Sequence, residues 1–416
     1  MICDAEKDRI KDLCGIIKAR IENFHIRKFK GHENELFLIS AQYPGVWMEH
    51  VYDSLMFAGL DKRGEKLSEN IINLFIDNQT EEGQLPCYIL NKALWRHDIP
   101  IIGYSQIQEC VSFATLCLEA CEMTENEALL KKCYAALSKW MGWFEKYRQT
   151  RKTGLIEMFF GYDTGHDESS RLDGLSCPGN FVKDGITQNA AVLPPDDKVA
   201  PILAVDMNCN YYANLRALSL MAKKLFLDEQ SAQWAEKAKK VKQLIFEYCF
   251  DKDDAFFYDV DKNGNKRKSR SCTVFHLFME HLLDKNEDEK LIEEIKQRYL
   301  KNPDEFFTPY PYPSMSIAQS KDKPHVKRNC WGYFSQGLIA LRCTRWMDDY
   351  GMSEEFDLLC EKWLCAWTEC FDEIKFGQEL DPISGKPSPS SEWYSSTMLF
   401  YLYAAKRLGI CDCICD

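Results

Sequence analysis

Apolar residues recur along most of this chain with the spacing of one helix face, and this periodicity restricts the fold more than any other feature. In the window 65–79, Leu67, Ile71, Leu74 and Phe75 fall on a single stripe. The best strand candidate is the short run 255–261, and clear strands are otherwise few. Windows of helical spacing predict twelve helices, at 5–24, 52–60, 65–79, 105–123, 127–148, 207–226, 232–248, 271–284, 288–300, 332–350, 354–370 and 394–408.

The links between these helices alternate in character. Short polar links such as 122–127 and 226–231 join helix pairs, whereas other links are long and rich in glycine, proline and aromatic residues. Long irregular links are uncommon in a compact domain unless they serve a function. No polar linker divides the chain and no sequence repeat is evident. We therefore predict an all-α fold, in which residues 1–416 form one domain. It is a toroid of helical hairpins whose long loops gather at one end around a central site.

Charge, hydropathy and cysteine usage exclude several classes of protein. A net charge of −12 disfavours binding to nucleic acid or to an anionic membrane surface. No apolar run reaches the roughly 18 residues of a membrane span. The nineteen cysteines are irregularly spaced, and the N-terminus lacks the apolar stretch of a signal peptide. These features predict a cytoplasmic protein with reduced thiols, while the oligomeric state stays open.

No cofactor or metal is expected. The eight histidines show no HxH or HExxH spacing, and no glycine-rich phosphate loop is present. The C-terminal "CDCICD" offers three thiols at alternate positions, but a closed zinc site usually needs four ligands. A frayed tail is the favoured interpretation of that segment.

Acidic residues with aromatic neighbours stand in several long links. The acids are Asp53, Asp167, Asp206 and Glu379. Acid pairs suit glycoside hydrolysis, in which one carboxyl protonates the leaving oxygen and the other activates water. Aromatic walls raise the pKa of the acid and stack on sugar rings. Three of these acids also have a plainer interpretation: a surface salt bridge of Asp167 with Arg171, an Asp-Pro turn after Glu379, and a helix cap at Asp206.

Four segments, in order, resemble trehalases and the related family-63 α-glycosidases, which include the mannosylglycerate hydrolases. "GHDESSRLD" at 165–173 resembles the G-x-D-x-S-x-R segment that carries their general acid. The stretch 43–60 resembles their W-x-W-D-S-F-F-x-A-x-G-L segment, and 204–225 resembles their V-D-L-N helix. "FGQELDPISGKP" at 376–387 resembles their E-x-[YF]-[DN]-P-x-T-G segment.

The resemblance implies an (α/α)6 barrel that inverts the anomeric centre, with Asp167 as general acid and Glu379 as general base. Arg171, if placed beside Glu379, would help to keep that base ionised, and His166, next to Asp167, is a further candidate for contact with substrate. The residues that the resemblance implies for sugar binding, or for orienting the acid, are Tyr52, Asp53, Gln106, Arg171, Asp206, Trp331 and Trp393.

The expected activity is that of an exo-α-glycosidase acting on a terminal glucosyl or mannosyl residue of a small glycoside. Three points stay open. Glu168, next to Asp167, is an alternative proton donor. "CWGYFSQ" at 330–336 lacks the arginine of the related W-R-G-P-x-W segment, which leaves true trehalase activity unsupported. A sugar epimerase on the same barrel, or a non-catalytic sugar-binding protein, remains the alternative function.

Overall fold

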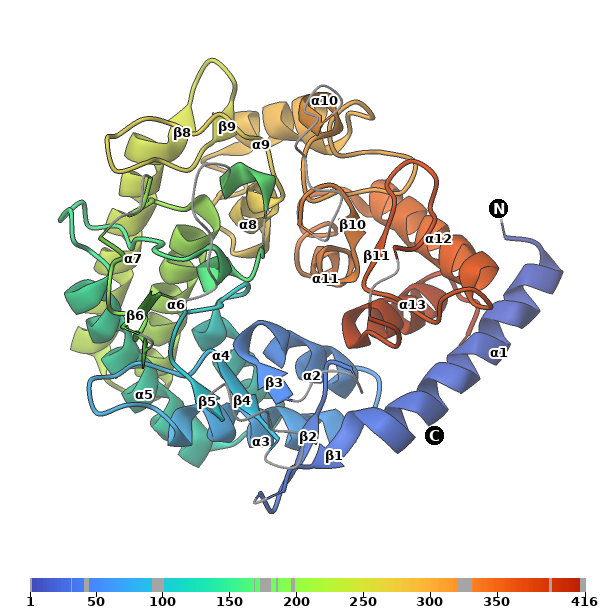
Figure 1. Cartoon of the computed structure of the whole chain (residues 1–416), viewed down its shortest axis with the longest axis horizontal. Helices are drawn as coiled ribbons and strands as arrows, with labels where there is room; N and C mark the ends of the chain where they lie inside the picture. Colours follow the sequence, from blue (N-terminus) through green and yellow to red (C-terminus); the bar gives the residue numbers. More distant parts are fainter. Residues whose placement is uncertain are drawn as a thin grey trace.

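Two concentric rings of helices form the molecule, as the expected (α/α)6 barrel requires (Figure 1). The computed structural model describes residues 2–30, 32–40, 45–91, 101–167, 169–172, 181–184, 186–195, 199–320, 331–388 and 391–411. The inner ring consists of α2 (Val51–Ala58), α4 (Phe113–Met123), α6 (Val205–Lys224), α8 (Thr273–Met279), α11 (Gly337–Arg342) and α13 (Ser395–Arg407). The outer ring consists of α1 (Asp4–Arg20), α3 (Arg63–Asp77), α5 (Glu127–Tyr147), α7 (Asp228–Cys249), α9 (Glu289–Ile295) and α12 (Ser353–Cys370).

Inner helices contact their neighbours around the ring, from α11 through α13, α2, α4 and α6 to α8. Trp346, which follows α11, closes the circle by packing its ring on Phe275 and Phe278 of α8. Burial follows the two rings. On outer helix α3 the predicted stripe is buried at Leu67, and Lys66 next to it is exposed. Inner helix α6 is buried on nearly every face, as expected for a helix packed between the barrel centre and the outer ring.

Short helical and strand segments occupy the links. The helical ones are α10 (Ile317–Ser320), the π-type turns η1 (Ile21–His25) and η5 (Lys296–Leu300), and the 3₁₀ turns η2 (Met48–His50), η3 (Gly161–Thr164), η4 (Ser170–Leu172) and η6 (Cys343–Arg345). The strands form small antiparallel sheets: β1 (Ile26–Lys28) with β2 (Glu35–Phe37), β3 (Gly45–Trp47) with β4 (Tyr88–Leu90) and β5 (Ile102–Gly103), β6 (Val182–Lys183) with β7 (Ile186–Thr187), β8 (Phe250–Asp251) with β9 (Phe256–Phe257), and β10 (Ser335–Gln336) with β11 (Glu379–Leu380).

Three predicted helices extend beyond the helices of the structure. The window 105–123 is helical only from Phe113, because Ser112 caps α4 by accepting the N–H of Thr115 at 3.2 Å. In the window 332–350 the α-helix is only α11, Gly337–Arg342, and in the window 271–284 it is only α8, Thr273–Met279. Within the strand candidate 255–261, only Phe256–Phe257 pairs as a strand. Elsewhere the predicted helices are confirmed, with ends that shift by a few residues.

Candidate active site

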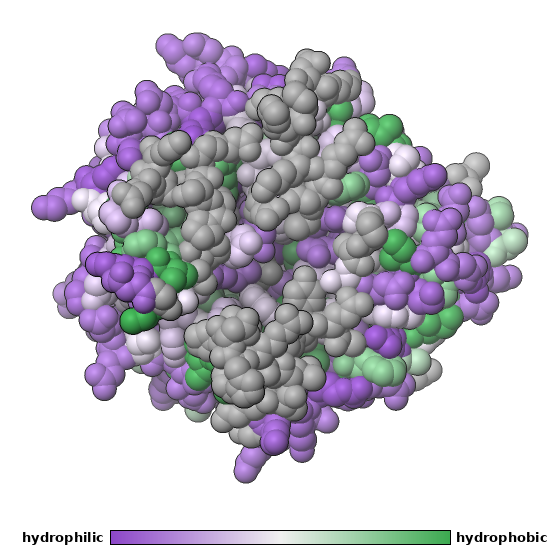
Figure 2. Space-filling view, in the orientation of Figure 1, coloured by the Kyte–Doolittle hydropathy of each residue, from purple (hydrophilic) through white to green (hydrophobic). Residues whose placement is uncertain are grey.

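The connectivity of the two rings explains why the candidate residues gather at one end. Every link from an outer to an inner helix has 23 or more residues, whereas every described link from an inner to an outer helix has ten or fewer. Because consecutive helices run antiparallel, all the long links lie at the end where the inner helices begin. Figure 2 shows this face hollowed at its centre. The candidate acids lie on the long links or in the first turn of an inner helix.

Arg171 is the hub of a buried charge network. Its guanidinium donates to both oxygens of Asp206, at 2.6 and 3.3 Å, and to both oxygens of Asp259, at 2.9 and 3.2 Å. A further bond of 3.1 Å runs to the hydroxyl of Thr164. Burial opposes ionisation of Asp206, but the charge of Arg171 and the hydrogen bond from His166 outweigh it and hold the pKa of Asp206 well below its ordinary value. Burial raises the pKa of Asp259.

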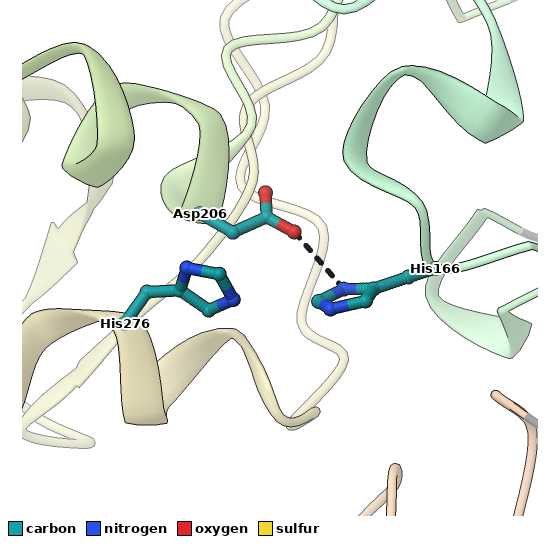
Figure 3. A group of neighbouring side chains, drawn as sticks. All are labelled: His166, Asp206 and His276. Carbon is teal, nitrogen blue, oxygen red and sulfur yellow. Dashed lines mark ion pairs between the residues drawn. The ribbon is translucent and has the colours of Figure 1, made fainter. Parts of the chain in front are cut away.

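His166 joins this network through Asp206, and His276 lies beside the pair (Figure 3). The Nδ1 of His166 lies 3.1 Å from Oδ2 of Asp206, and the ring is 4.4 Å from the ring of Trp331 and 5.5 Å from that of His276, centre to centre. Burial lowers the pKa of His166 to about 4, so the imidazole is neutral near pH 7. Because the carboxylate of Asp206 can only accept, Nδ1 of His166 carries the proton of this bond.

The spacing of His166, Asp206 and His276 also satisfies a metal site, since one ligand atom from each lies within 4.8 Å of the others. The surroundings do not favour a cation. Arg171 already binds both oxygens of Asp206, and its positive charge would repel a divalent ion at that point. The group is better suited to holding a neutral imidazole against a carboxylate.

Glu379 lies on β11, whose pairing with β10 sets Gln336 beside it. The amide of Gln336 donates to Oε2 of Glu379 at 2.7 Å, and the hydroxyl of Ser388 donates to Oε1. Burial raises the pKa of Glu379, while these two hydrogen bonds act in the opposite direction. The carboxyl of Glu379 is 4% exposed, so it contacts little bulk solvent.

Asp163, in the turn η3 just before the segment 165–173, anchors the link that carries Asp167. The carboxylate of Asp163 accepts the backbone N–H groups of Ile107, Phe159 and Phe160 at 2.8–3.0 Å. It also binds the guanidinium of Arg148 at 2.6 and 3.2 Å, and both side chains are fully buried. Four residues beyond Asp163, the half-buried Asp167 follows His166 directly.

Gln106 belongs to the link that Asp163 holds. Its amide donates to the side-chain oxygen of Gln108 at 2.9 Å and accepts the hydroxyl of Ser105 at 3.1 Å. The loop around Gln106 and the loop of Asp167 are thereby fastened to each other through Asp163 and Ile107.

Asp53 joins the first and last inner helices. Its carboxylate is 1% exposed and accepts the hydroxyls of Ser395 and Ser396 at the start of α13, the latter at 2.9 and 3.1 Å. Burial raises the pKa of Asp53 to about 6, against the effect of these bonds.

One expectation does not match the contacts. Arg171 binds Asp206 and Asp259 and is not a neighbour of Glu379, whose donors are Gln336 and Ser388; the expectation that it ionises Glu379 is wrong.

Tyr52 and Trp393 lie apart from the central group. The hydroxyl of Tyr52 bonds that of Thr344 at 2.6 Å, and the guanidinium of Arg345 covers its ring. The ring of Trp393 packs on Phe371 and Phe376, and the guanidinium of Arg20 from α1 lies 4.9 Å from its centre. These contacts are typical of residues that pack helices together, and a role of Tyr52 or Trp393 in sugar binding stays a prediction. Glu168 and the tail residues 412–416 lie outside the described residues.

Sequence reasoning missed two members of the network. Asp259 lies in the strand candidate 255–261, where an acid between buried aromatic and aliphatic residues was the available signal. His276 lies in an otherwise apolar helix, where a lone histidine reads as core. The Nδ1 of His276 is 3.2 Å from the side-chain oxygen of Asn210.

A family model described as "Mannosylglycerate hydrolase MGH1-like glycoside hydrolase domain" matches residues 57–331. Among solved structures, the fold is similar to that of a mannosylglycerate hydrolase from Thermus thermophilus, solved in complex with glucose. The TM-score is 0.69 and the identity 14%, over 95% of this chain and 99% of the other. Neutral trehalase from Saccharomyces cerevisiae gives 0.63 and 15%, over 95% and 81%. A rhamnosidase from Klebsiella oxytoca with rhamnose bound gives 0.58 and 11%, over 98% and 64%.

Comparison with curated protein sequences gives no match. Among the described residues, no helix has both the length and the apolar character needed to cross a membrane.

Proposed function

Because this chain belongs to the mannosylglycerate hydrolase MGH1-like family of glycoside hydrolases, we propose that it is an inverting exo-α-glycosidase acting on a small glycoside with a terminal hexosyl residue of the glucosyl or mannosyl type. The proposed general acid is Asp167 and the proposed general base is Glu379. The observation that carries this proposal is that these two carboxyl groups stand on different long links at one end of the barrel, the one before α6 and the one before α13.

In the proposed mechanism Asp167 donates its proton to the glycosidic oxygen as the bond to the anomeric carbon breaks. Glu379 removes a proton from a water molecule that attacks the opposite face of that carbon, so the product has the inverted anomeric configuration. The bonds from Ser388 and Gln336 favour the ionised form that a base needs. Arg171 binds Asp206 and Asp259, and Asp206 in turn positions His166. Asp53 connects the starts of α2 and α13.

The test is a pair of isosteric variants assayed with aryl α-glucoside, aryl α-mannoside, trehalose and glucosylglycerate. Asp167→Asn and Glu379→Gln are each expected to lower kcat by about 10²–10⁴-fold with an unchanged circular dichroism spectrum. Asp381→Asn, two residues beyond Glu379, is the matched control and should keep activity. Proton NMR should show the β-anomer as first product; an α-anomer, or full activity in either variant, contradicts the proposal.

One observation favours a second candidate, a sugar epimerase that uses two histidines as acid and base. His166 and His276 are both buried, and their rings lie 5.5 Å apart. Net isomerisation of a free sugar without hydrolysis of any glycoside, lost in His276→Ala, would support this reaction. Membership of a glycoside hydrolase family makes hydrolysis the first choice.

A further inference from the structure

Arg342, the last residue of α11, is a buried arginine whose guanidinium makes no hydrogen bond or ion pair with any residue that the structure describes. The residue is 5% exposed. Its Nη2 atom is buried and donates no hydrogen bond to any described residue. The Nε and Nη1 atoms of Arg342 are not buried to the same degree. A buried charge without a direct partner costs several kcal/mol in general, so an anion bound to Arg342 would remove this cost.

The charge of Arg342 reaches several parts of the inner ring. It acts on titratable groups of three other parts of the inner ring: His50 and Asp53 around the start of α2, His166 in the long link before α6, and Cys272, His276 and Glu280 around α8. Helix side chains tilt toward the helix N-terminus. The guanidinium therefore points back from the end of α11 toward the face that holds the long links.

No acid among the described residues forms an ion pair or a hydrogen bond with Arg342. Asp206 and Asp259 are bound by Arg171, and Asp53 is bound by Ser395 and Ser396. Glu280 accepts the N–H of Ser112 at 3.1 Å, and burial raises the pKa of Glu280 to about 7, so this carboxyl is only partly ionised near neutral pH. His166 and His276 are neutral, because burial lowers the pKa of each.

We propose that Arg342 binds a carboxylate on the terminal sugar, so that the preferred substrate is an α-linked hexuronide whose C6 is a carboxylate. The inference rests on the proposed glycosidase function and names its substrate class. One unpaired guanidinium with one accessible edge matches a singly charged planar carboxylate. A phosphate dianion would need a second free cation. Because an exo-acting enzyme takes the terminal sugar deepest, an anion at this depth belongs to that sugar and not to the leaving group.

The experiment compares wild type, Arg342→Met and Arg342→Lys, with Arg345→Met as the control. Arg345, three residues further along the chain, has a side chain that is 10% exposed and is already paired with Glu119, at 2.8 and 3.1 Å. Thermal unfolding is measured alone and with sodium D-glucuronate, D-glucose, D-glycerate or sodium chloride. We expect glucuronate to raise the Tm of the wild type well above the other additions, and this shift to vanish in Arg342→Met. Without ligand, Arg342→Met should melt higher than the wild type and Arg345→Met lower.

Kinetics with aryl α-glucuronide and aryl α-glucoside provide the second readout. The ratio of their kcat/KM values should fall about 100-fold in Arg342→Met, with partial recovery in Arg342→Lys. A lower ligand-free Tm of Arg342→Met with an unchanged ratio would make Arg342 structural and overturn the inference. If glycerate alone raised the Tm, the carboxylate that Arg342 binds would belong to the leaving group. That result would also overturn the inference. An equal shift by chloride would mean an adventitious ion only.

Failure of the proposed function gives a different result. Binding of glucuronate that depends on Arg342, without hydrolysis of any glycoside, supports the carboxylate site and refutes the glycosidase. Hydrolysis of neutral glycosides that is indifferent to glucuronate and to Arg342→Met supports the glycosidase and refutes the carboxylate site.

Discussion

The buried pair of Asp163 and Arg148 gives the sharpest stability prediction. Replacing Asp163 by Asn keeps the shape and one acceptor oxygen but leaves the Arg148 guanidinium in a fully buried position without a counter-charge. Breaking a buried pair from one side costs about 3–5 kcal/mol. The weakened bonds from Ile107, Phe159 and Phe160 add about 1 kcal/mol or more. We expect a total loss of about 4–6 kcal/mol, a large part of the roughly 5–15 kcal/mol that stabilises a typical protein.

Urea unfolding followed by tryptophan fluorescence measures this loss, with Asp284→Asn as the control. Asp284 also accepts two backbone N–H groups, but on an exposed loop, so its replacement should leave the midpoint close to that of the wild type. The double variant Arg148→Met/Asp163→Asn should lose less than the sum of the two single variants, because it removes both charges. A loss below about 1 kcal/mol in Asp163→Asn, or strict additivity in the double variant, would refute the view that this pair holds the Asp167 loop.

Two further predictions concern pH. Burial raises the pKa of Glu280 from 4.5 to about 7, so the folded state binds its proton more tightly than the unfolded state and loses stability as the pH rises from about 4.5 to 7. Glu280→Gln should therefore gain about 3 kcal/mol relative to the wild type between about pH 4.5 and 8, measured by urea unfolding; a constant difference would contradict the shift. Ser388→Ala removes a bond that lowers the pKa of Glu379, so the acidic limb of the kcat/KM profile should move to higher pH, and an unmoved limb would argue against Glu379 as base.

Periodicity predicted the helices well because each one buries a stripe of its own residues, as α3 does with Leu67. Their ends were harder to predict, since they depend on partners distant in sequence. The start of α4 is fixed by Ser112, whose N–H is bound by Glu280, 168 residues away. The short α11 begins where Gln336 pairs with Glu379.

The resemblance supplied the candidate residues of the site, but the hydrogen bonds and ion pairs among them could not be predicted from the sequence. Arg171 and Asp206 do lie together, but the second partner, Asp259, is 88 residues from Arg171 and stands in a strand-like run. Tyr52 sits next to Asp53 in sequence, yet the rotation of α2 turns its hydroxyl to Thr344. Sequence spacing gives no information on which side of a helix meets which neighbour.

The short and the long links between the two rings differ in how much change they can tolerate during evolution. The links of ten residues or fewer keep adjacent helices in register, so insertions there would disturb the ring. The links of 23 residues or more all open on one face and can change in length and composition while the rings stay intact. A barrel of this kind can acquire a new sugar preference by rewriting its loops and a few inward-facing positions. That freedom accounts for a shared architecture at 14% identity.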